Sequence, residues 1–389
     1  MKSSSKLSAF IQAYPDDCYS YPIHISHAAV KPPLIVDLLE RLRCSSIVIF
    51  YDAFLSDNPV YMDLLEALKQ SCLSTKSSLF VKAIEPGKHS KTLGTIESLC
   101  QWLISCCVQR DALFFAVGGG VVGDLIGFLS STYYRGVPLV HVPTNLLSMC
   151  DSAIGGKTAV NTSLHVNSLG TYKHPVMNIT FLHFLDSLTD REFAAGFAEI
   201  YKISLLPGGH DLQSLIEDRS FCLHSLRQDF NMLHSIIAQA INLKLIYTTN
   251  DIQESSKRLF LNIGHTFGHA IESIQDLRSE EYFRHGEAVA LGLCCCVALS
   301  DSLYGTNRLP GLQRTLQKLS LPTRISSEFR DLVPCAANAF VDALIDLAFA
   351  DKKGIGGSLR IVLLDAHGQA VLFPTNDRDL MRQAFLAVI

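Results

Sequence analysis

The sequence predicts an α/β domain with a mostly parallel sheet over residues 1–187, followed by an all-helical domain over residues 188–389 that ends in a β-hairpin. Two observations support this fold class. In the first half, short apolar runs rich in β-branched and aromatic residues alternate with longer runs that repeat apolar residues at helical spacing, as in βαβα folds. From Leu188 onward, one helical pattern follows another. At 389 residues, the chain is long enough to bury two cores.

The strands of the first domain are predicted from five apolar runs. These are IVIFYDA (47–53), SLFVKAI (78–84), ALFFAVGGG (112–120), PLVHVPT (138–144) and MNITFLHFL (177–185). The stretches PPLIVDLLERLR, VYMDLLEALKQ and TIESLCQWLISC have the apolar spacing of helices. Because strands and helices alternate, the sheet should be mostly parallel.

The second domain is predicted from four helical stretches. They are TDREFAAGFAEIYKISLL, FNMLHSIIAQAINLKLIYTTN, LNIGHTFGHAIES and HGEAVALGLCCCVALSDSLYG. Near the end, SLRIVLLDAHGQAVLFP (358–374) has the alternation and the glycine-containing turn of a β-hairpin.

The composition excludes several classes of protein. With 48% hydrophobic and 18% charged residues, the chain is globular and not disordered. A net charge of -4 argues against a general nucleic-acid binder. The longest apolar run, around LGLCCCVALS, falls short of the roughly 20 residues that a membrane span requires. The N-terminus MKSSSKLSAF lacks an apolar signal core, so the 12 cysteines should be thiols in a cytoplasmic protein.

The glycine-rich stretch AVGGGVVGDLIGFLSSTYYRG (116–136) runs from the end of a strand into a helical pattern. Glycines let a backbone approach a ligand closely, and the helix N-terminus that follows favours a phosphate. The stretch is therefore a candidate pyrophosphate cradle. A tight turn packed against a neighbouring helix is the alternative, because the triple glycine does not have the usual form of the dinucleotide fingerprint.

A second pair of glycines precedes Lys157 and Thr158 in VPTNLLSMCDSAIGGKTAVN (142–161). The first glycine of a P-loop is missing, which excludes a P-loop nucleoside triphosphatase. Lys157 could bind a substrate phosphate, or it could be an ordinary surface lysine.

His265 and His269 stand four residues apart in LNIGHTFGHAIES, so they share one face of a helix. Spacing alone does not decide between metal ligands and two packed histidines. A zinc site needs at least one further protein ligand.

Taken together, these motifs resemble those of the 3-dehydroquinate synthase family within the sugar phosphate cyclases. The matching blocks follow the family order and are GGGVVGDLIGF, YYRG, VPTNLL, DSAIGGKTAVN, AGFAEIYK, RLFLNIGHTFGHA, HGEAVALG and DKKGIGGSLRIVLL. The resemblance implies an α/β nucleotide-binding domain followed by a helical metal-binding domain.

The resemblance also implies a metal centre. Its ligands are Glu199, His265 and His285, and His269 becomes a substrate-facing acid/base. The metal is zinc, with cobalt as the alternative. One carboxylate and two imidazoles leave a position open for substrate.

The implied reaction converts 3-deoxy-D-arabino-heptulosonate 7-phosphate, a sugar phosphate, to 3-dehydroquinate and phosphate, with NAD reduced and then re-oxidised. The implied substrate residues are Asp151, Lys157, Asn167, Lys202, Lys244, Arg258, Asn262, and Lys352 or Lys353. The implied cofactor residues are Asp52, Lys91, Gly119, Gly120, Asp124, Thr144, Asn145, Lys157, Phe184 and Ser187. Arg135 is expected to reach the phosphate of a neighbouring subunit in a homodimer.

Three features depart from the family pattern. Lys88 replaces the glutamate of PGE-x-x-K, Val166 replaces a lysine, and the strand FLHFL lacks the acidic residue usual near Phe181 or His183. A lysine cannot accept a hydrogen bond from a ribose hydroxyl. We expect an active but divergent enzyme.

Three other functions remain as alternatives. Another cyclase would act on sedoheptulose 7-phosphate or glucose 6-phosphate, and a metal-dependent polyol dehydrogenase would accumulate NADH. A homologue without activity would keep the fold for binding.

Overall fold

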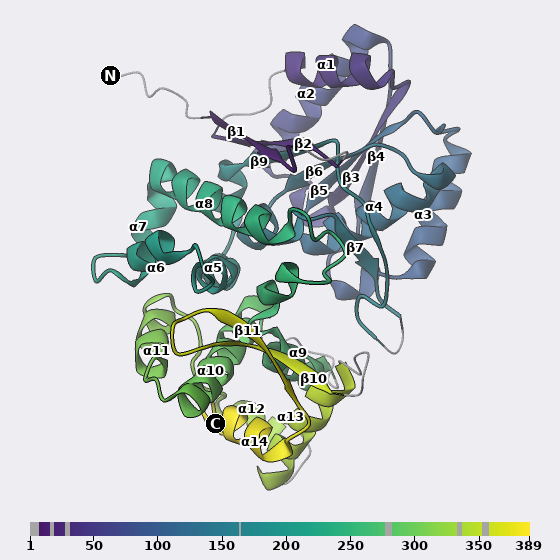
Figure 1. Ribbon diagram of the computed structural model, residues 1–389. Helices are drawn as coiled ribbons and strands as arrows, with labels where there is room; N and C mark the ends of the chain where they lie inside the picture. Colours follow the sequence, from purple (N-terminus) through teal and green to yellow (C-terminus); the bar gives the residue numbers. More distant parts are fainter. Residues whose placement is uncertain are drawn as a thin grey trace. The chain divides into compact units, whose positions relative to one another are not determined.

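The computed structural model in Figure 1 describes residues 8–15, 19–27, 32–162, 165–276, 282–332, 337–351 and 358–389. The chain forms two compact units. The first unit comprises Met1–Leu188 and Asp229–Leu245, and the second comprises Thr189–Gln228 and Ile246–Ile389. The return of residues 229–245 to the first unit was not anticipated from the sequence, because they belong to a helix that continues into the second unit.

A seven-stranded sheet forms the centre of the first unit, in the order β1-β2-β9-β6-β5-β3-β4. Only the β1–β2 pair is antiparallel, which confirms the predicted mostly parallel sheet. The strands are β1 (Ser8–Ala13), β2 (Tyr21–Ser26), β3 (Ser46–Asp52), β4 (Ser78–Ile84), β5 (Leu113–Gly118), β6 (Leu139–Pro143) and β9 (Met177–Phe181).

Three of the predicted strands are shorter than expected, and β1 and β2 were not predicted. The run 138–144 forms a strand only over Leu139–Pro143. The run 112–120 stops at Gly118 because helix α4 begins at Gly120. The run 177–185 stops at Phe181 because Leu182–Ser187 coils into a 3-10 segment.

The order of the strands creates a topological switch point between β3 and β5. From β3 the chain moves outward to β4, then returns past β3 to form β5 on its other side and continues to β6. In open parallel sheets, ligands bind beyond the carboxyl ends of the strands at such a point.

Helices cover both faces of this sheet, which explains why its central strands are apolar throughout. Val48, Phe50 and Phe114 pack with α3 and α4 in one buried cluster. On another part of β3, Tyr51 stacks on Tyr61 of α2. The helices of the first unit are α1 (Pro32–Leu42), α2 (Pro59–Thr75), α3 (Leu93–Ser105), α4 (Gly120–Thr132) and most of α8 (Phe230–Thr248).

A small hairpin, β7 (Lys157–Val160) and β8 (Leu169–Tyr172), lies against α4 and was not predicted. A Cβ atom at Gly127 of α4 would lie 2.3 Å from Thr158, so the hairpin sits directly on the helix backbone. This contact places Lys157, at the start of β7, and Asn167, in the loop before β8, in the first unit.

The second unit is mainly helical, as expected. Its helices are α5 (Asp190–Ser204), α6 (His210–Glu217), α7 (Leu223–Gln228), α9 (His265–Asp276), α10 (His285–Tyr304), α11 (Leu309–Lys318), α12 (Ser327–Leu332), α13 (Ala337–Asp351) and α14 (Arg378–Leu386). The predicted hairpin is confirmed as β10 (Leu359–Leu364) paired with β11 (Ala370–Thr375).

Among the described helices, α10 alone is long and apolar enough to cross a membrane by length and composition. Of its most apolar window, 78% is buried inside the protein, as in the core helix of a globular domain. This burial accounts for the run CCC at residues 294–296, whose thiols are all buried.

Candidate active site

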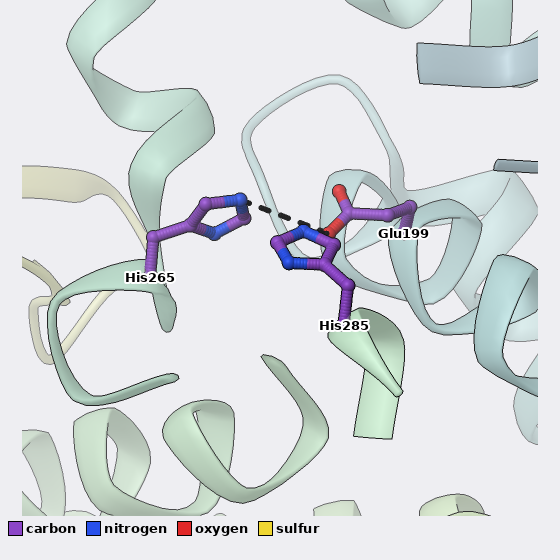
Figure 2. A group of neighbouring side chains, drawn as sticks. All are labelled: Glu199, His265 and His285. Carbon is purple, nitrogen blue, oxygen red and sulfur yellow. Dashed lines mark ion pairs between the residues drawn. The ribbon is translucent and has the colours of Figure 1, made fainter. Parts of the chain in front are cut away.

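Three helices of the second unit bring together the predicted metal ligands. Glu199 lies on α5, His265 begins α9 and His285 begins α10, and their ligand atoms all lie within 4.8 Å of one another. Figure 2 shows both imidazole rings turned toward the carboxylate. Oε1 of Glu199 lies 3.5 Å from Nε2 of His285 and 3.8 Å from Nε2 of His265.

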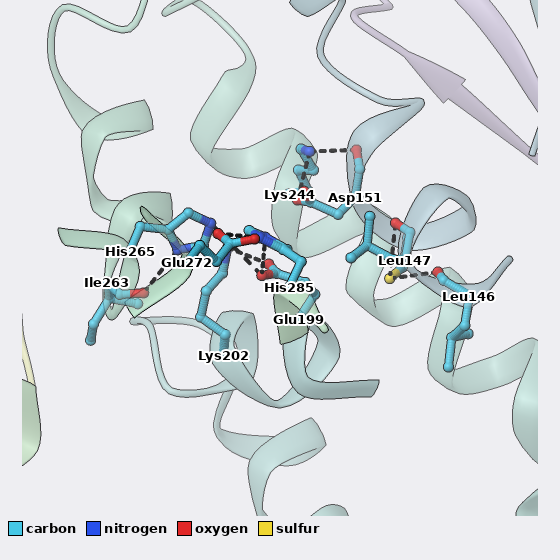
Figure 3. A network of polar contacts seen from close by, with 11 residues as sticks. Leu146, Leu147, Asp151, Glu199, Lys202, Lys244, Ile263, His265, Glu272 and His285 are labelled. Atoms are coloured by element: carbon cyan, nitrogen blue, oxygen red, sulfur yellow. Dashed lines mark hydrogen bonds and ion pairs between the residues drawn. The ribbon is translucent and has the colours of Figure 1, made fainter. Parts of the chain in front are cut away.

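The other nitrogen of each ring faces an oxygen outside the ligand group (Figure 3). Nδ1 of His285 lies 3.0 Å from Oε2 of Glu272, and Nδ1 of His265 lies 3.4 Å from the carbonyl oxygen of Ile263. Such contacts fix the tautomer and the direction of a metal-binding ring. Both Nε2 atoms are thereby left to face Glu199. Glu272 was not predicted from the sequence, although it follows His265 by seven residues, which is two helical turns.

The charges around Glu199 suit a cation. Its side chain is 1% exposed, and neither carboxylate oxygen has a hydrogen bond of regular geometry among the described residues. Burial alone would raise the pKa of Glu199, but Lys202, whose Nζ is 2.5 Å from Oε2, and His285 outweigh it and lower the pKa to about 2. Burial lowers the pKa of His285, but Glu272 and Glu199 raise it to about 10.

This donor set fits a divalent metal. An ionised carboxylate and two imidazoles are the donors of catalytic zinc sites that leave one position open. A bound cation would take the place of the proton on His285 and supply positive charge beside Glu199.

His269 lies one helical turn after His265 on α9. Its ring centre is 5.3 Å from that of His265 and 6.3 Å from that of His285. The predicted acid/base residue, His269, thus borders the candidate metal centre. Lys202, an almost fully buried cation, lies beside Glu199 of that centre.

Two predicted substrate residues of the second unit, Arg258 and Asn262, lie on one 3-10 segment, Lys257–Asn262. Arg258 is buried, its backbone N–H donates to Asp251, and its Nη1 donates to the carbonyl of Ile252 at 2.7 Å. Nδ2 of Asn262 donates to Oε1 of Glu254 at 2.8 Å. Asp251 and Glu254 were missed because carboxylates in a turn-rich stretch (NDIQESSKR) are ordinary in any sequence.

The predicted cofactor residues line the carboxyl edge of the sheet in the first unit. Asp52 ends β3, Gly119 follows β5, and Thr144 follows β6 with its N–H donating to the carbonyl of Gly118 at 3.1 Å. Gly119 is the N-cap of α4 and provides no side-chain cap. A Cβ at Gly119 would lie 2.5 Å from Nδ2 of Asn145. A larger residue at this position would therefore displace the amide of Asn145, and the helix N-terminus lies at the switch point, where an anion is favoured.

Lys91 connects a predicted cofactor residue to a predicted substrate residue. Its Nζ lies 2.5 Å from Oδ2 of Asp124 and contacts Oδ1 of Asn167. Burial raises the pKa of Asp124, and Lys91 opposes that shift. Asn167 has a left-handed backbone with a φ of 55°, so the buried lysine also stabilises a strained turn.

Lys244 and Asp151, both predicted substrate residues, form an ion pair within the first unit. Nζ of Lys244 lies 2.7 Å from Oδ1 of Asp151 and 2.5 Å from its carbonyl oxygen. Figure 3 marks both contacts with dashed lines. Lys157 is exposed at the start of β7. Arg135 is also exposed, on a turn where Tyr134 and Arg135 both have positive φ.

The remaining predicted positions differ in exposure. Phe184 is fully buried and packs against Phe181, so its side chain belongs to the core. The hydroxyl of Ser187 donates to the carbonyl of Phe184 at 2.8 Å. Gly120 begins α4 beside Ser152. Lys352 and Lys353 lie outside the described residues.

Most of the positions that depart from the family pattern are exposed, but Phe181 is buried. Lys88 lies on the short 3-10 segment after β4, and 58% of Val166 is exposed. His183 is also exposed, and its Nδ1 lies 2.9 Å from Oδ2 of Asp186.

Comparison with known proteins bears on both halves of the chain. The model of the 3-dehydroquinate synthase N-terminal family matches residues 81–195, and that of the C-terminal family matches residues 196–354. The 3-dehydroquinate synthase of Vesicomyosocius okutanii is 31% identical over 94% of this chain and 95% of its own. That of Leptospira interrogans is 35% identical over 84% and 85%. The pentafunctional AROM polypeptide of Mycosarcoma maydis is 31% identical over 91% of this chain, which spans only 22% of that longer protein.

Solved structures show the same fold. A 2-deoxy-scyllo-inosose synthase complexed with carbaglucose-6-phosphate, NAD+ and Co2+ superposes with a TM-score of 0.78 at 21% identity, covering 98% of this chain and 100% of the other. The 2-epi-5-epi-valiolone synthase ValA of Streptomyces hygroscopicus, with NAD+ and Zn2+ bound, gives 0.75 at 24% identity, covering 95% and 96%. Since models of both family domains match and a relative aligns over nearly its full length, this chain belongs to the 3-dehydroquinate synthase family.

Proposed function

We propose that the protein is a 3-dehydroquinate synthase of the shikimate pathway. It converts 3-deoxy-D-arabino-heptulosonate 7-phosphate to 3-dehydroquinate and phosphate, and it requires NAD and a divalent metal, either zinc or cobalt. The family assignment and the curated relatives support this activity. The observation that carries the proposal is the convergence of Glu199, His265 and His285 from three helices, with Glu272 behind His285.

In this proposal, Glu199, His265 and His285 hold the metal. When bound, a divalent metal polarises a substrate oxygen as a Lewis acid. Lys202 keeps Glu199 ionised, and Glu272 keeps Nε2 of His285 directed at the site. His269, one turn beyond His265, moves a proton to or from the substrate.

Cationic and amide groups bind the anionic substrate. Arg258 and Asn262 are held on one rigid segment, and Lys244 is oriented by Asp151. Lysine and arginine suit phosphate and carboxylate groups because they form charge-assisted hydrogen bonds. Lys157 and Asn167 complete this set of residues in the first unit, and Arg135 contributes across the interface of a homodimer.

The cofactor binds at the switch point of the sheet. NAD supplies a reversible hydride acceptor. Asp52 offers a carboxylate to a ribose hydroxyl, and the backbone of Gly119 and Gly120 approaches the pyrophosphate at the start of α4. Lys91, Asp124, Thr144, Asn145 and the segment with Phe184 and Ser187 form the rest of this site.

We also assign the protein to the cytoplasm. Every cysteine in the described ranges is a free thiol, which agrees with a reducing compartment.

The test is an assay of phosphate release and dehydroquinate formation with purified protein, with and without NAD and zinc. We expect turnover that needs only catalytic amounts of NAD, stops with a chelator and returns with zinc. Turnover only on sedoheptulose 7-phosphate or glucose 6-phosphate would identify another cyclase. Net accumulation of NADH would identify a dehydrogenase, and metal binding without turnover would leave a binding role.

A further inference from the structure

Two ion pairs join the first turn of α5 to the start of α10. Arg191 donates from Nε and Nη2 to the two carboxylate oxygens of Glu287, each at 2.7 Å. In the second pair, the carboxylate belongs to α5 and the guanidinium to the start of α10. Oε1 of Glu192 lies 2.6 Å from Nε of Arg284. We call these four residues the helix clamp. The bidentate geometry of the first pair defines direction as well as distance.

The clamp also holds the backbone that leads into α10. Nη2 of Arg191 donates to the carbonyl of Tyr282 at 2.5 Å, and Oε2 of Glu287 accepts the backbone N–H of Arg284 at 2.9 Å. Glu287 therefore caps the first turn of α10 while it binds α5. Its side chain is only 10% exposed, so water screens the pair weakly from that side.

Next to the clamp, the two helices touch through their backbones. A Cβ atom at Gly286 would lie 1.8 Å from the carbonyl oxygen of Ala195, so only glycine fits there. Arg191, Ala195 and Glu199 are spaced four residues apart and share one face of α5. Along this face, the clamp, the backbone contact and a metal ligand follow one another, opposite a helix whose first residue is His285.

We propose that Arg191 and Glu287 are positioning residues for the metal centre, and that their pair sets the metal affinity by fixing the start of α10 relative to Glu199. Helix ends fray, and a ligand on the first residue of a helix keeps its place only if that turn is held. The inference rests on the metal ligands of the proposed function but not on its substrate or its reaction.

The test is a zinc titration of the full-length protein, first stripped of metal, in competition with a chromophoric chelator. Arg191→Met keeps most of the side-chain stem but removes the pair, and we expect zinc to bind about 10- to 100-fold more weakly, as for other supporting residues of metal sites. Arg191→Lys keeps the charge without the bidentate geometry and should fall between Arg191→Met and the wild type. Adding Glu287→Gln to Arg191→Met should cost little more, because the two residues act as one unit.

The control is Arg382→Met, which breaks the contact of Arg382 on α14 with Asp342 on α13. It removes a helix–helix ion pair of the same unit and should leave the zinc affinity unchanged. The melting temperature of the metal-free protein should fall about as much in Arg382→Met as in Arg191→Met. Wild-type affinity in Arg191→Met, or an equal loss in Arg382→Met, would overturn the proposal. His285→Ala must abolish tight binding, since otherwise the ligand set is wrong and the clamp has no such role. The zinc titration contains no substrate, so it tests the role of the clamp equally well if the protein has no catalytic activity.

Discussion

Nδ1 of His285 lies 3.0 Å from Oε2 of Glu272, so a carboxylate on α9 orients the ring of a predicted metal ligand at the start of α10. Glu272→Leu should therefore weaken zinc binding by about 10- to 100-fold, because the ring loses both its direction and a negative charge nearby. Glu272→Gln should lose less, since an amide oxygen still accepts from Nδ1. Chelator competition measures both affinities, and circular dichroism checks the fold. Unchanged affinity in Glu272→Leu would show that His285 does not depend on this contact.

Asp251 organises the turn that carries Arg258 and Asn262. Its Oδ1 accepts the N–H and the hydroxyl of Ser255, and its Oδ2 accepts the N–H groups of Ser256 and Arg258, all at 2.8–2.9 Å. In Asp251→Asn, an amide NH₂ replaces one carboxylate oxygen and faces hydrogen-bond donors. At least one donor then loses its acceptor, which costs about 1–3 kcal/mol. We expect kcat/KM for the heptulosonate phosphate to fall at least about tenfold.

The control for this variant is Asp377→Asn. Asp377 also accepts two backbone N–H groups, but at the N-cap of α14. It should leave both the stability and kcat/KM nearly unchanged, because asparagine caps a helix about as well as aspartate and its single amide oxygen can accept both N–H groups. Equal kinetics for wild type and Asp251→Asn would remove Asp251 from any role in substrate binding.

His141 makes the stability of the first unit depend on pH. Burial lowers its pKa to about 4, whereas in the unfolded chain it titrates near 6.5. Between these values, unfolding takes up a proton at His141, so the contribution of this residue to stability is constant above about pH 7 and falls as the pH drops. At pH 5, His141 lowers the free energy of unfolding by about 2 kcal/mol relative to its value above pH 7.

His141→Gln should flatten the pH dependence between pH 7 and 5. Urea unfolding followed by the fluorescence of Trp102, the single tryptophan, reports on the same unit. His367→Gln, on the exposed turn between β10 and β11, is the matched control and should leave the slope as it is. If His141→Gln keeps the wild-type slope, the proton is taken up elsewhere.

Lys88 should weaken the binding of NAD compared with the glutamate that the family pattern has at this position. It is exposed on the loop after β4, next to the strand that ends in Asp52, and it has no acceptor for a ribose hydroxyl. Lys88→Glu restores an acceptor and should lower the Kd of NAD by about 2- to 10-fold, measured by isothermal titration calorimetry. Lys88→Met separates the removal of the positive charge from the gain of an acceptor. Weaker binding of NAD by Lys88→Glu would mean that the lysine itself contacts the cofactor.

The sequence by itself determined the fold class, the five main parallel strands and the helices that carry the predicted metal ligands. These features depend on local periodicity, which is two residues for a strand and about 3.6 for a helix, and on motifs such as GHTFGH in which residues lie close in the chain. The motif resemblance also named Glu199, His265 and His285, and the structure then brought these three together.

Only the tertiary structure decided what supports that group. Arg191 and Glu287 are 96 residues apart, and Lys244 and Asp151 are 93 residues apart, so no local pattern relates them. The hairpin β7–β8 escaped prediction because its strands are four residues long and its outer strand is largely exposed. Such ion pairs and short strands form only when packing brings distant segments of the chain together. Their stabilising partners come from those distant segments, because the neighbouring residues in the sequence do not supply them.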